Sequence, residues 1–339
     1  MGYHLSLLDK SPVQPGERAA AALARTIALA KAAERLGFHR FWLAEHHGMK
    51  VLASSAPEIL IAYILSQTSS IRVGSGGVML QHYAPYKVAE TFNMLSALAP
   101  GRVDLGVGKS PGGFPYSTRA LQAGRDAGHA SDFPSLLGEL DSYLSGAAGS
   151  AGALASPLPP VAPERFLLGA SVESAILAGE LGWRFVFAGQ FNGDPDLIER
   201  AFAAYADLTE LRPLLAVAAF VAPTQALAEQ KVANLRVFKV RLRGRPSVNL
   251  GSPEQAAEYA RQAGAEDYEV TETQPKILAG TPGHVRRELD RLHERFGVGE
   301  FIIDTPVAGE ADRFRSIELL AGEMLAPPSL ASLAVSAVQ

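Results

Sequence analysis

Cysteine is absent from all 339 residues of the sequence. Disulfide bonds, thiolate metal sites and cysteine nucleophiles are therefore excluded, and the absence is typical of a protein that works in a reducing compartment. The sequence also has no run of 18 apolar residues, and its N-terminus does not combine a charged segment with an apolar one. We therefore expect a cytoplasmic protein with neither a membrane span nor a secretory signal.

An excess of charge of one sign is missing as well. The 31 basic and 35 acidic residues are well mixed and give a formal net charge of −4. No stripe of basic residues interleaved with aromatic ones occurs, so we expect no nucleic-acid partner. With 47% hydrophobic residues, the chain is long enough for two ordinary domains or for one large α/β barrel.

Several catalytic motifs are also missing. The sequence contains no HExxH or second cluster with metal-ligand spacing, and no GxSxG turn, so we expect no metal site and no serine-hydrolase triad. The Gly108-Lys109-Ser110 tripeptide lacks the upstream glycine of a P-loop, which argues against nucleotide triphosphate hydrolysis. No GxGxxG fingerprint follows a predicted strand, so the sequence indicates no dinucleotide site of its own.

The sequence does contain a regular alternation of short apolar runs and amphipathic segments. The long helix predicted over 17–36, closed by Gly37, is one of the amphipathic segments. Eight strands are predicted, at residues 3–8, 40–44, 71–75, 102–108, 165–169, 183–188, 213–221 and 300–305. Strict alternation indicates parallel strands with right-handed crossovers. Eight such units favour a closed (β/α)8 TIM barrel over an open doubly wound sheet, which the pattern leaves possible.

Two segments interrupt the alternation. Residues 145–163 are rich in alanine, glycine, serine and proline, which indicates a flexible surface connection. Residues 237–279 show no clear period apart from a short helix near 253–262, so we expect an irregular insertion before the last βα unit. The pattern otherwise predicts one barrel domain over 1–330, followed by a C-terminal tail over 331–339.

The residues that follow each strand are the candidates for a site, because barrel sites lie at the carboxyl ends of the strands. The first strand ends in Asp9 and Lys10, and the second ends in Glu45-His46-His47. A strand alternates its side chains between two faces, so this triplet does not fit in a core without partners. We therefore expect the triplet at the rim of the barrel.

A second group of strand ends suggests an anion site. The segment GASVESA (169–175) begins a helix, and the hydroxyls of Ser171 and Ser174 and the amides from Ser171 onward can face a phosphate. Lys109, at the end of the adjacent strand, would supply the counter-charge. Ser171 as an ordinary N-cap is the alternative. With Lys109 considered, the two interpretations are about equally supported.

The third strand carries an unusual pair of glycines in VGSGGV (73–78), where Ser75 precedes Gly76 and Gly77. Glycine in a strand often marks the close approach of a ligand or of another backbone. A flat aromatic ring pressed against the backbone would need such a place. A β-bulge explains the pair equally well.

Three stretches resemble a known family. They are LGFHRFWLAEHHG (36–48), the long segment from Ser54 to Gly113, and FRSIELLAG (314–322). These stretches are similar to the bacterial luciferase-like flavin monooxygenases, and more narrowly to the single-chain oxidoreductase branch of that group. The similarity is densest over residues 34–113.

The resemblance implies a (β/α)8 barrel that holds reduced FMN, or the deazaflavin F420 in sister branches, at this rim. His46 matches the family's strand-2 histidine, which lies near the flavin and is implicated in base chemistry. Glu45 is expected to hydrogen-bond a neighbouring ring nitrogen or backbone group within the cofactor site. Gly76 and Gly77 match a non-proline cis peptide that backs the isoalloxazine ring, and Ser75 leads into it.

The resemblance also assigns the phosphate end of the flavin. Lys109 falls where many members have an arginine that pairs with this phosphate, and Ser171 and Ser174 match its contacts at the following helix. Lysine gives a point charge without the bidentate fork of arginine, which predicts weaker flavin binding. Gln190 and Asn192 stand where relatives often carry histidine, so the substrate side of the site departs from the family.

The function that follows is a two-component FMNH₂-dependent monooxygenase. A separate flavin reductase would supply the reduced flavin, molecular oxygen would add to it as a C4a-peroxyflavin, and a small aldehyde or ketone would be oxygenated. One alternative is an F420-dependent oxidoreductase that transfers a hydride without oxygen. Another is a flavin-binding protein without catalysis.

Two further expectations come from the resemblance. We expect a homodimer, with the apolar helices predicted over 56–69 and 86–98 as its interface. The insertion at 237–279 corresponds to a lid-like region in the family. Its basic run KVRLRGR (239–245) would either close over the site or form a solvated loop, and we favour the solvated loop.

Overall fold

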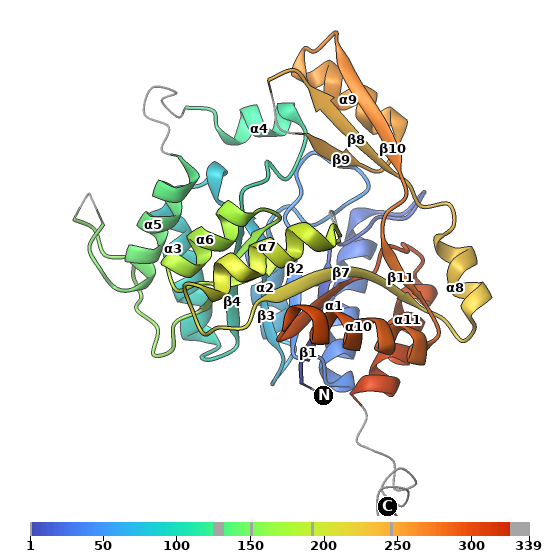
Figure 1. Cartoon of the computed structure of the whole chain (residues 1–339). Helices are drawn as coiled ribbons and strands as arrows, with labels where there is room; N and C mark the ends of the chain where they lie inside the picture. Colours follow the sequence, from blue (N-terminus) through green and yellow to red (C-terminus); the bar gives the residue numbers. More distant parts are fainter. Residues whose placement is uncertain (1, 125–131, 150–151, 191–192, 245–246, 326–339) are drawn as a thin grey trace, which may run out of the picture.

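The computed structural model describes residues 2–124, 132–149, 152–190, 193–244 and 247–325, and the tail expected over 331–339 lies outside them. Eight parallel strands form its centre (Figure 1): β1 (His4–Asp9), β2 (Arg40–Leu43), β3 (Arg72–Met79), β4 (Val103–Gly108), β5 (Glu164–Gly169), β6 (Arg184–Phe187), β7 (Leu214–Val221) and β12 (Glu300–Asp304). Each strand pairs with its neighbour, and β12 pairs with both β7 and β1. The ring is therefore closed, which confirms the (β/α)8 barrel and excludes the open sheet.

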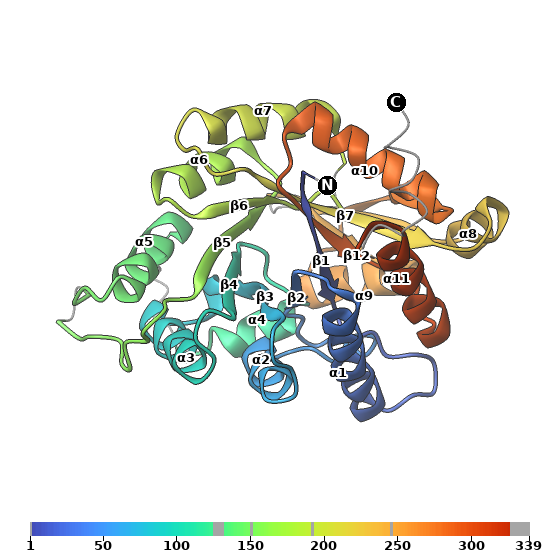
Figure 2. The same ribbon diagram turned by 90° about the horizontal axis from the view of Figure 1, so that it is seen from below.

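The helices surround this barrel, as the view along its axis shows (Figure 2). They are α1 (Ala19–Leu36), α2 (Pro57–Leu65), α3 (Pro85–Leu98), α5 (Phe133–Leu144), α6 (Val172–Glu180), α7 (Pro195–Ala206), α8 (Gln225–Val232), α10 (Pro282–Phe296) and α11 (Glu310–Met324). Gly37 ends α1 with a left-handed φ of 84°, as its sequence position predicts. A short helix, α4 (Pro115–Leu121), and a 3₁₀ turn, η1 (Leu80–His82), lie in segments that the hydrophobic pattern did not assign.

The lower end of the barrel is filled by charged side chains. Arg40 is buried and its guanidinium bonds Asp104 at 3.0 Å and Glu300 at 2.9 Å. The Trp42 indole N–H donates to the second oxygen of Asp104 at 2.9 Å, and Phe166 packs edge-on against Trp42. Buried charges are stable in this form because each is paired. The N-terminal end of the barrel is therefore plugged, so a site has to lie at the other end.

The insertion before the last βα unit is ordered, which corrects the expectation of an irregular segment. It contains β8 (Val237–Leu242), β9 (Val248–Leu250) and β10 (Tyr268–Thr273), an antiparallel sheet in the order β10-β8-β9, and the helix α9 (Pro253–Ala263). In Figure 1 it stands above the carboxyl ends of the barrel strands. The pattern missed β10 because all six of its residues are exposed and none marks a buried face.

Two neighbouring segments hold the insertion in place. The strand β11 (Ile277–Gly280) pairs with Ala218–Val221 of β7 and so continues the barrel sheet upward. Residues of α9 bind α4, where the Tyr116 amide donates to the Gln262 side chain at 3.0 Å and Arg119 donates to the Gln262 carbonyl at 3.1 Å. Lys239 to Leu242 of the basic run lie on β8, where Val240 and Leu242 are buried while Lys239 and Arg241 are exposed, and Arg241 lies 3.6 Å from Glu269. The described basic side chains of this strand are therefore solvated.

The low-complexity connection is more firmly packed than its composition predicts. Ala155 is buried, and its carbonyl accepts a hydrogen bond from the Asn93 amide at 3.2 Å. The Tyr86 hydroxyl of α3 donates to the Leu154 carbonyl at 3.2 Å. This part of the surface connection is therefore anchored to α3. Among the described helices, none is both long and apolar enough to cross a membrane.

Candidate active site at the carboxyl ends of the strands

Some inward-facing side chains become smaller toward the upper end of the barrel. In and just after β2 they change from Arg40 and Trp42 to Ala44, and in β7 they change from Leu214 to Ala216. These upper residues pack with Leu8 and Ile302 in one inner cluster. The floor of the mouth is therefore apolar and combines alanines with larger aliphatic side chains.

Glu45 and His47 of the strand-2 triplet bond to each other. Glu45 Oε1 lies 2.6 Å from His47 Nε2 and accepts from the Tyr83 hydroxyl at 2.8 Å, while Glu45 Oε2 accepts from the Met79 amide at 3.2 Å. Glu45 is buried. Burial of Tyr83, and next the negative charge of Glu45, raise the pKa of the Tyr83 hydroxyl. The expected bonds to a ring nitrogen and to backbone are confirmed, and a direct contact with a cofactor stays a prediction.

His46 points the other way. The side chains of Trp42 and Ala44 face the interior, so strand alternation directs His46 into the mouth. Its backbone amide donates to the Ser54 carbonyl at 2.8 Å, and its Nδ1 is buried without a hydrogen-bond partner among the described residues. Burial, with the charges of Lys10 and His47, lowers the pKa of the His46 imidazole to about 3.

The low pKa sets His46 apart from an ordinary imidazole, which titrates near neutrality and so exchanges its proton readily at physiological pH. In this structure the ring is neutral over the whole physiological range. A neutral imidazole is a hydrogen-bond partner and proton carrier that gains a proton only when negative charge develops beside it. The unpartnered Nδ1 is the atom at which this would occur.

The two glycines of β3 face protein atoms. A Cβ on Gly76 would meet Leu8 at 2.8 Å and Trp42 at 3.2 Å, and one on Gly77 would meet the Gly106 carbonyl oxygen at 2.7 Å. The register of β3 with β4 shifts at this point, and the peptide bond between Gly76 and Gly77 is cis, as the resemblance implied. The close approach of another backbone and the β-bulge are thus confirmed, and the contact with a ring stays a prediction.

Ser75 is occupied within the sheet. Its hydroxyl donates to the Gly106 carbonyl at 2.8 Å and accepts from the Gly106 amide at 3.1 Å. The side chain is buried, so its hydroxyl is committed to the sheet. Ser75 therefore fixes the spacing of β3 and β4 beneath the glycine pair.

Ser171 is the N-cap of α6, which confirms that interpretation. Its side chain accepts from the Ser174 amide at 3.3 Å, and the two hydroxyls are also 3.3 Å apart. Bonds to its own amide and to Ser171, with a smaller contribution from Lys109, lower the pKa of Glu173 in the first turn. Lys109 is exposed and its charge acts at this helix end. The phosphate contact stays a prediction for all three residues.

The loop that carries Lys109 is tied to the triplet. The His47 amide donates to the Gly112 carbonyl at 2.8 Å, and His47 forms a parallel bridge with Gly113. The His82 ring bonds the Pro111 carbonyl at 2.8 Å. The ends of β2 and β4 therefore form one connected rim.

Two residues at the mouth, Lys10 and Asp304, were not assigned a role by the sequence analysis. Lys10 Nζ lies 2.5 Å from Asp304 Oδ2, an ion pair that joins the ends of β1 and β12. The Gln190 side-chain oxygen after β6 is buried without a partner in the part of the chain that the structure describes. Lys10 is a strand end in the sequence pattern, Asp304 carries no signal of its own, and Gln190 is the position where the sequence departs from the family. Asn192 lies outside the described residues.

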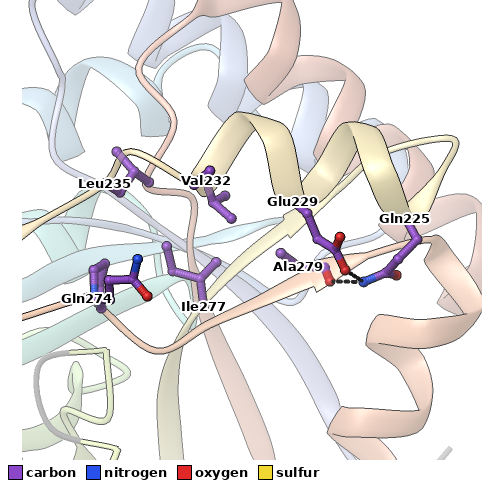
Figure 3. Close-up of a pocket in the computed structure, with 9 residues that line it drawn as sticks. Gln225, Glu229, Val232, Leu235, Gln274, Ile277 and Ala279 are labelled. Atoms are coloured by element: carbon purple, nitrogen blue, oxygen red, sulfur yellow. Dashed lines mark hydrogen bonds between the residues drawn. The ribbon is translucent and has the colours of Figure 1, made fainter.

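Cavities also lie outside the mouth, and one of about 540 Å³ lies beside β8 and β10 in the insertion. A second of about 420 Å³ lies between α8 and β11, where Glu229 bonds the Gln225 amide at 2.8 Å (Figure 3). Another of about 300 Å³ separates the loop after β4 from α9 and is lined by Pro111, Gly113, Pro115, Thr118, Arg119 and Tyr259. No group of three or more metal-ligating side chains occurs among the described residues. The polar groups that converge on the barrel axis therefore remain the candidate site.

A closed barrel with polar side chains gathered at its carboxyl ends is the architecture of α/β-barrel enzymes. The chain belongs to the luciferase-like monooxygenase family, which residues 1–298 match. It is 44% identical over 330 residues to N-acetyl-S-alkylcysteine monooxygenase of Bacillus subtilis (strain 168), with 95% of this chain and 98% of that relative covered. It is 32% identical to a luciferase-like monooxygenase of Escherichia coli (strain K12), with 93% and 95% covered.

Solved structures show the same fold. The crystal structure of apo-MsnO8 superposes with a TM-score of 0.76 at 33% identity and covers 96% of this chain and 99% of its own. The oxygenating constituent of 3,6-diketocamphane monooxygenase from Pseudomonas putida, in complex with FMN, gives 0.70 at 21% identity over 95% and 98%. An F420-dependent secondary alcohol dehydrogenase gives 0.66 at 14% identity over 96% and 99%. The last two likenesses concern the fold alone.

Proposed function

We propose that this protein is a two-component, FMNH₂-dependent monooxygenase that works in the cytoplasm with a separate flavin reductase and molecular oxygen. The observation that carries the proposal is the mouth itself, where His46 has a lowered pKa and its Nδ1 has no hydrogen-bond partner among the described residues, above an apolar inner cluster. Membership of the monooxygenase family supports it. The sequence has no dinucleotide-binding fingerprint, so a separate protein would have to supply the reduced flavin.

The residues present fit FMN. The first turn of α6, with Ser171 and Ser174, and the nearby ammonium of Lys109 would hold the phosphate. The backbone of Gly76 and Gly77 would lie behind the ring system, and Glu45 would support the rim through His47 and Tyr83. When bound, reduced flavin supplies the two electrons that activate oxygen.

The chain's own contribution is to position groups, exclude water and manage one proton. His46 would hold or pass that proton at Nδ1, since no described protein group occupies this atom. The plugged lower barrel keeps water out from below. The insertion, which α9 attaches to α4, would act as a lid over the mouth.

Two substrate classes follow from different observations. A small aldehyde or ketone is the class that the family resemblance suggests. The 44% identity with N-acetyl-S-alkylcysteine monooxygenase, over nearly the whole of both chains, favours a thioether of an N-acylated amino acid. Because this likeness includes the complete barrel, we place N-acetyl-S-alkylcysteines first in a substrate screen.

The experiment that tests the proposal is rapid mixing of the anaerobic protein–FMNH₂ complex with oxygenated buffer while absorbance is recorded. A transient spectrum that is neither reduced nor oxidised FMN, and that decays faster with substrate, would support oxygen chemistry. Direct formation of oxidised FMN at the rate seen without protein would contradict it.

Two alternative functions would give different experimental results. An F420-dependent enzyme shares the fold, and tight binding of F420 with hydride transfer to a carbonyl compound would favour that reading. A flavin-binding protein without catalysis would bind FMN tightly but leave its reaction with oxygen unchanged. The same mixing experiment, repeated with F420, separates all three.

We also propose a homodimer formed through α2 and α3. Four apolar side chains on these neighbouring helices are strongly exposed: Ile59 (66%), Tyr63 (53%), Met94 (53%) and Leu98 (75%). An apolar patch of this kind marks a protein interface. Sedimentation should show a dimer that Leu98→Glu dissociates and that Leu227→Glu, on α8, leaves intact. A wild-type monomer would contradict the proposal.

A further inference from the structure

We propose that Lys10, fixed by Asp304 at the barrel mouth, binds the carboxylate of the substrate. The inference rests on the proposed function, because an N-acetyl-S-alkylcysteine carries a free carboxylate while a simple aldehyde or ketone does not. It assigns a role to an ion pair that neither the sequence pattern nor the family resemblance identified.

The strand geometry places both partners inside the mouth. The Ser6 hydroxyl donates to Glu300, and Leu8 belongs to the inner cluster, so alternate residues of β1 face the barrel axis. Lys10 is the next residue in that series. In β12, Glu300 and Ile302 face inward in the same way, and Asp304 follows them.

The two side chains differ in exposure. The Lys10 side chain is 25% exposed, whereas that of Asp304 is 7% exposed. Lys10 is therefore the more accessible member of the pair. An ammonium has three N–H donors and can serve a second carboxylate while Asp304 fixes its position.

Lys10 shares the mouth with His46. Burial is the largest cause of the low pKa of His46, and the positive charge of Lys10 is the second. Both keep the imidazole neutral. A carboxylate held by Lys10 would therefore bring the rest of a small substrate next to His46, where the proton is managed. This places recognition and chemistry at one site.

The other cations of the barrel are committed elsewhere. Arg40 and Arg72 lie at the opposite end, where both bind Asp104. Arg313 is buried on α11 and binds Asp9 at 3.0 Å. Lys109 acts at the first turn of α6, where the flavin phosphate is expected. Lys10 is thus the basic side chain whose charge acts on His46 at the mouth.

The test compares N-acetyl-S-methylcysteine with its neutral carboxamide. Lys10→Met should raise KM for the acid about ten-fold or more and leave KM for the amide nearly unchanged, since a charge-assisted bond is lost. Asp304→Asn should lower KM for the acid, because it removes a competing negative charge. The exposed Lys50, in the loop after β2, is the matched control: Lys50→Met should change neither.

The opposite changes in KM expected for Lys10→Met and Asp304→Asn distinguish substrate recognition from a purely structural role of the ion pair. If Lys10 and Asp304 only hold β1 against β12, both variants should weaken binding of acid and amide alike, which would overturn the inference. The double variant Lys10→Met/Asp304→Asn leaves no buried charge unpaired, so it should keep the fold and still lose preference for the acid. Equal acid-to-amide ratios in wild type and double variant would also overturn it.

Calorimetric binding of the same two compounds separates this inference from the proposed function. If neither compound is oxidised but wild type binds the acid and Lys10→Met does not, the Lys10 site stands and the substrate assignment fails. If both compounds are oxidised with equal KM in all variants, the monooxygenase stands and the Lys10 site fails. Absence of acid binding to wild type overturns the site directly.

Discussion

Glu45 and His47 are bonded to each other, with 2.6 Å between Oε1 and Nε2, on the side of β2 that faces away from the barrel axis. Two of the three polar residues that end this strand therefore satisfy one another, together with Tyr83. Only His46 is directed into the mouth. We therefore propose a supporting role for Glu45 and His47 and a role in proton transfer for His46.

His46→Ala should keep the fold and FMN binding but lose most of the turnover. General acid–base groups contribute about 10²–10⁴-fold, so we expect a loss of that order in kcat. FMN binding is followed by flavin fluorescence and folding by circular dichroism. Turnover equal to wild type would remove His46 from the mechanism.

The same residue should affect stability at low pH. The native pKa of His46 is about 3, below the ordinary value near 6.5, so the unfolded state binds a proton that the native state does not. Stability is therefore lost as pH falls from about 6.5 toward 3. Denaturant unfolding should show a shallower decline over this range for His46→Asn. Parallel curves for the two proteins would contradict the low pKa.

Lys109→Ala should weaken FMN binding about ten-fold or more and riboflavin binding very little, because riboflavin lacks the phosphate. Lys109→Arg should tighten FMN binding, since guanidinium bonds phosphate through two donors. Lys50→Ala is the control for loss of a rim charge. Fluorescence quenching of the oxidised flavins measures all of these. Equal weakening of both flavins would show that Lys109 does not contact the phosphate.

Glu34→Gln should destabilise the protein through a different region. Burial alone would raise the pKa of Glu34, but the amides of Ser70, Ile71 and Ser69 and the Ser70 hydroxyl lower it to about 2. The pKa of Glu34 in the native state lies below the ordinary value of 4.5. The stabilisation from its charge is therefore complete above pH 4.5 and is lost as the pH falls toward 2.

At pH 7 we expect a loss of about 1–3 kcal/mol in the free energy of unfolding for Glu34→Gln. The difference from wild type should shrink on acidification. Glu318→Gln, which breaks only an exposed pair with Arg315, should have little effect. A pH-independent difference would show that the charge of Glu34 is not what stabilises the turn.

Gln262→Ala should loosen the insertion without unfolding the barrel. Its side chain accepts from the Tyr116 amide, and Phe114 packs edge-on against Tyr259 beside it, with 6.0 Å between the ring centres. Hydrogen exchange should become faster in α9 while β1 to β4 keep their protection. Uniform acceleration would show that α9 and the barrel open together.

The sequence predicted the barrel and the rim position of the triplet because both follow from strand period and strand order. It did not predict the pKa of His46, which depends on burial and on Lys10. The pair Lys10–Asp304 joins residues 294 positions apart, so no local pattern indicates it. The strand β10 was missed because exposed residues carry no periodic signal.

The charged plug beneath Trp42 is built on Arg40, Asp104 and Glu300 and closes the lower end of the barrel. A ligand can therefore enter and leave only at the upper end. The ligand that binds deepest in the barrel must therefore bind first and dissociate last. A cofactor on the apolar floor would have to be seated before the substrate, and would be trapped while the substrate remained above it. The order of events in such an enzyme is thus imposed by a salt bridge at the end of the barrel where no chemistry takes place.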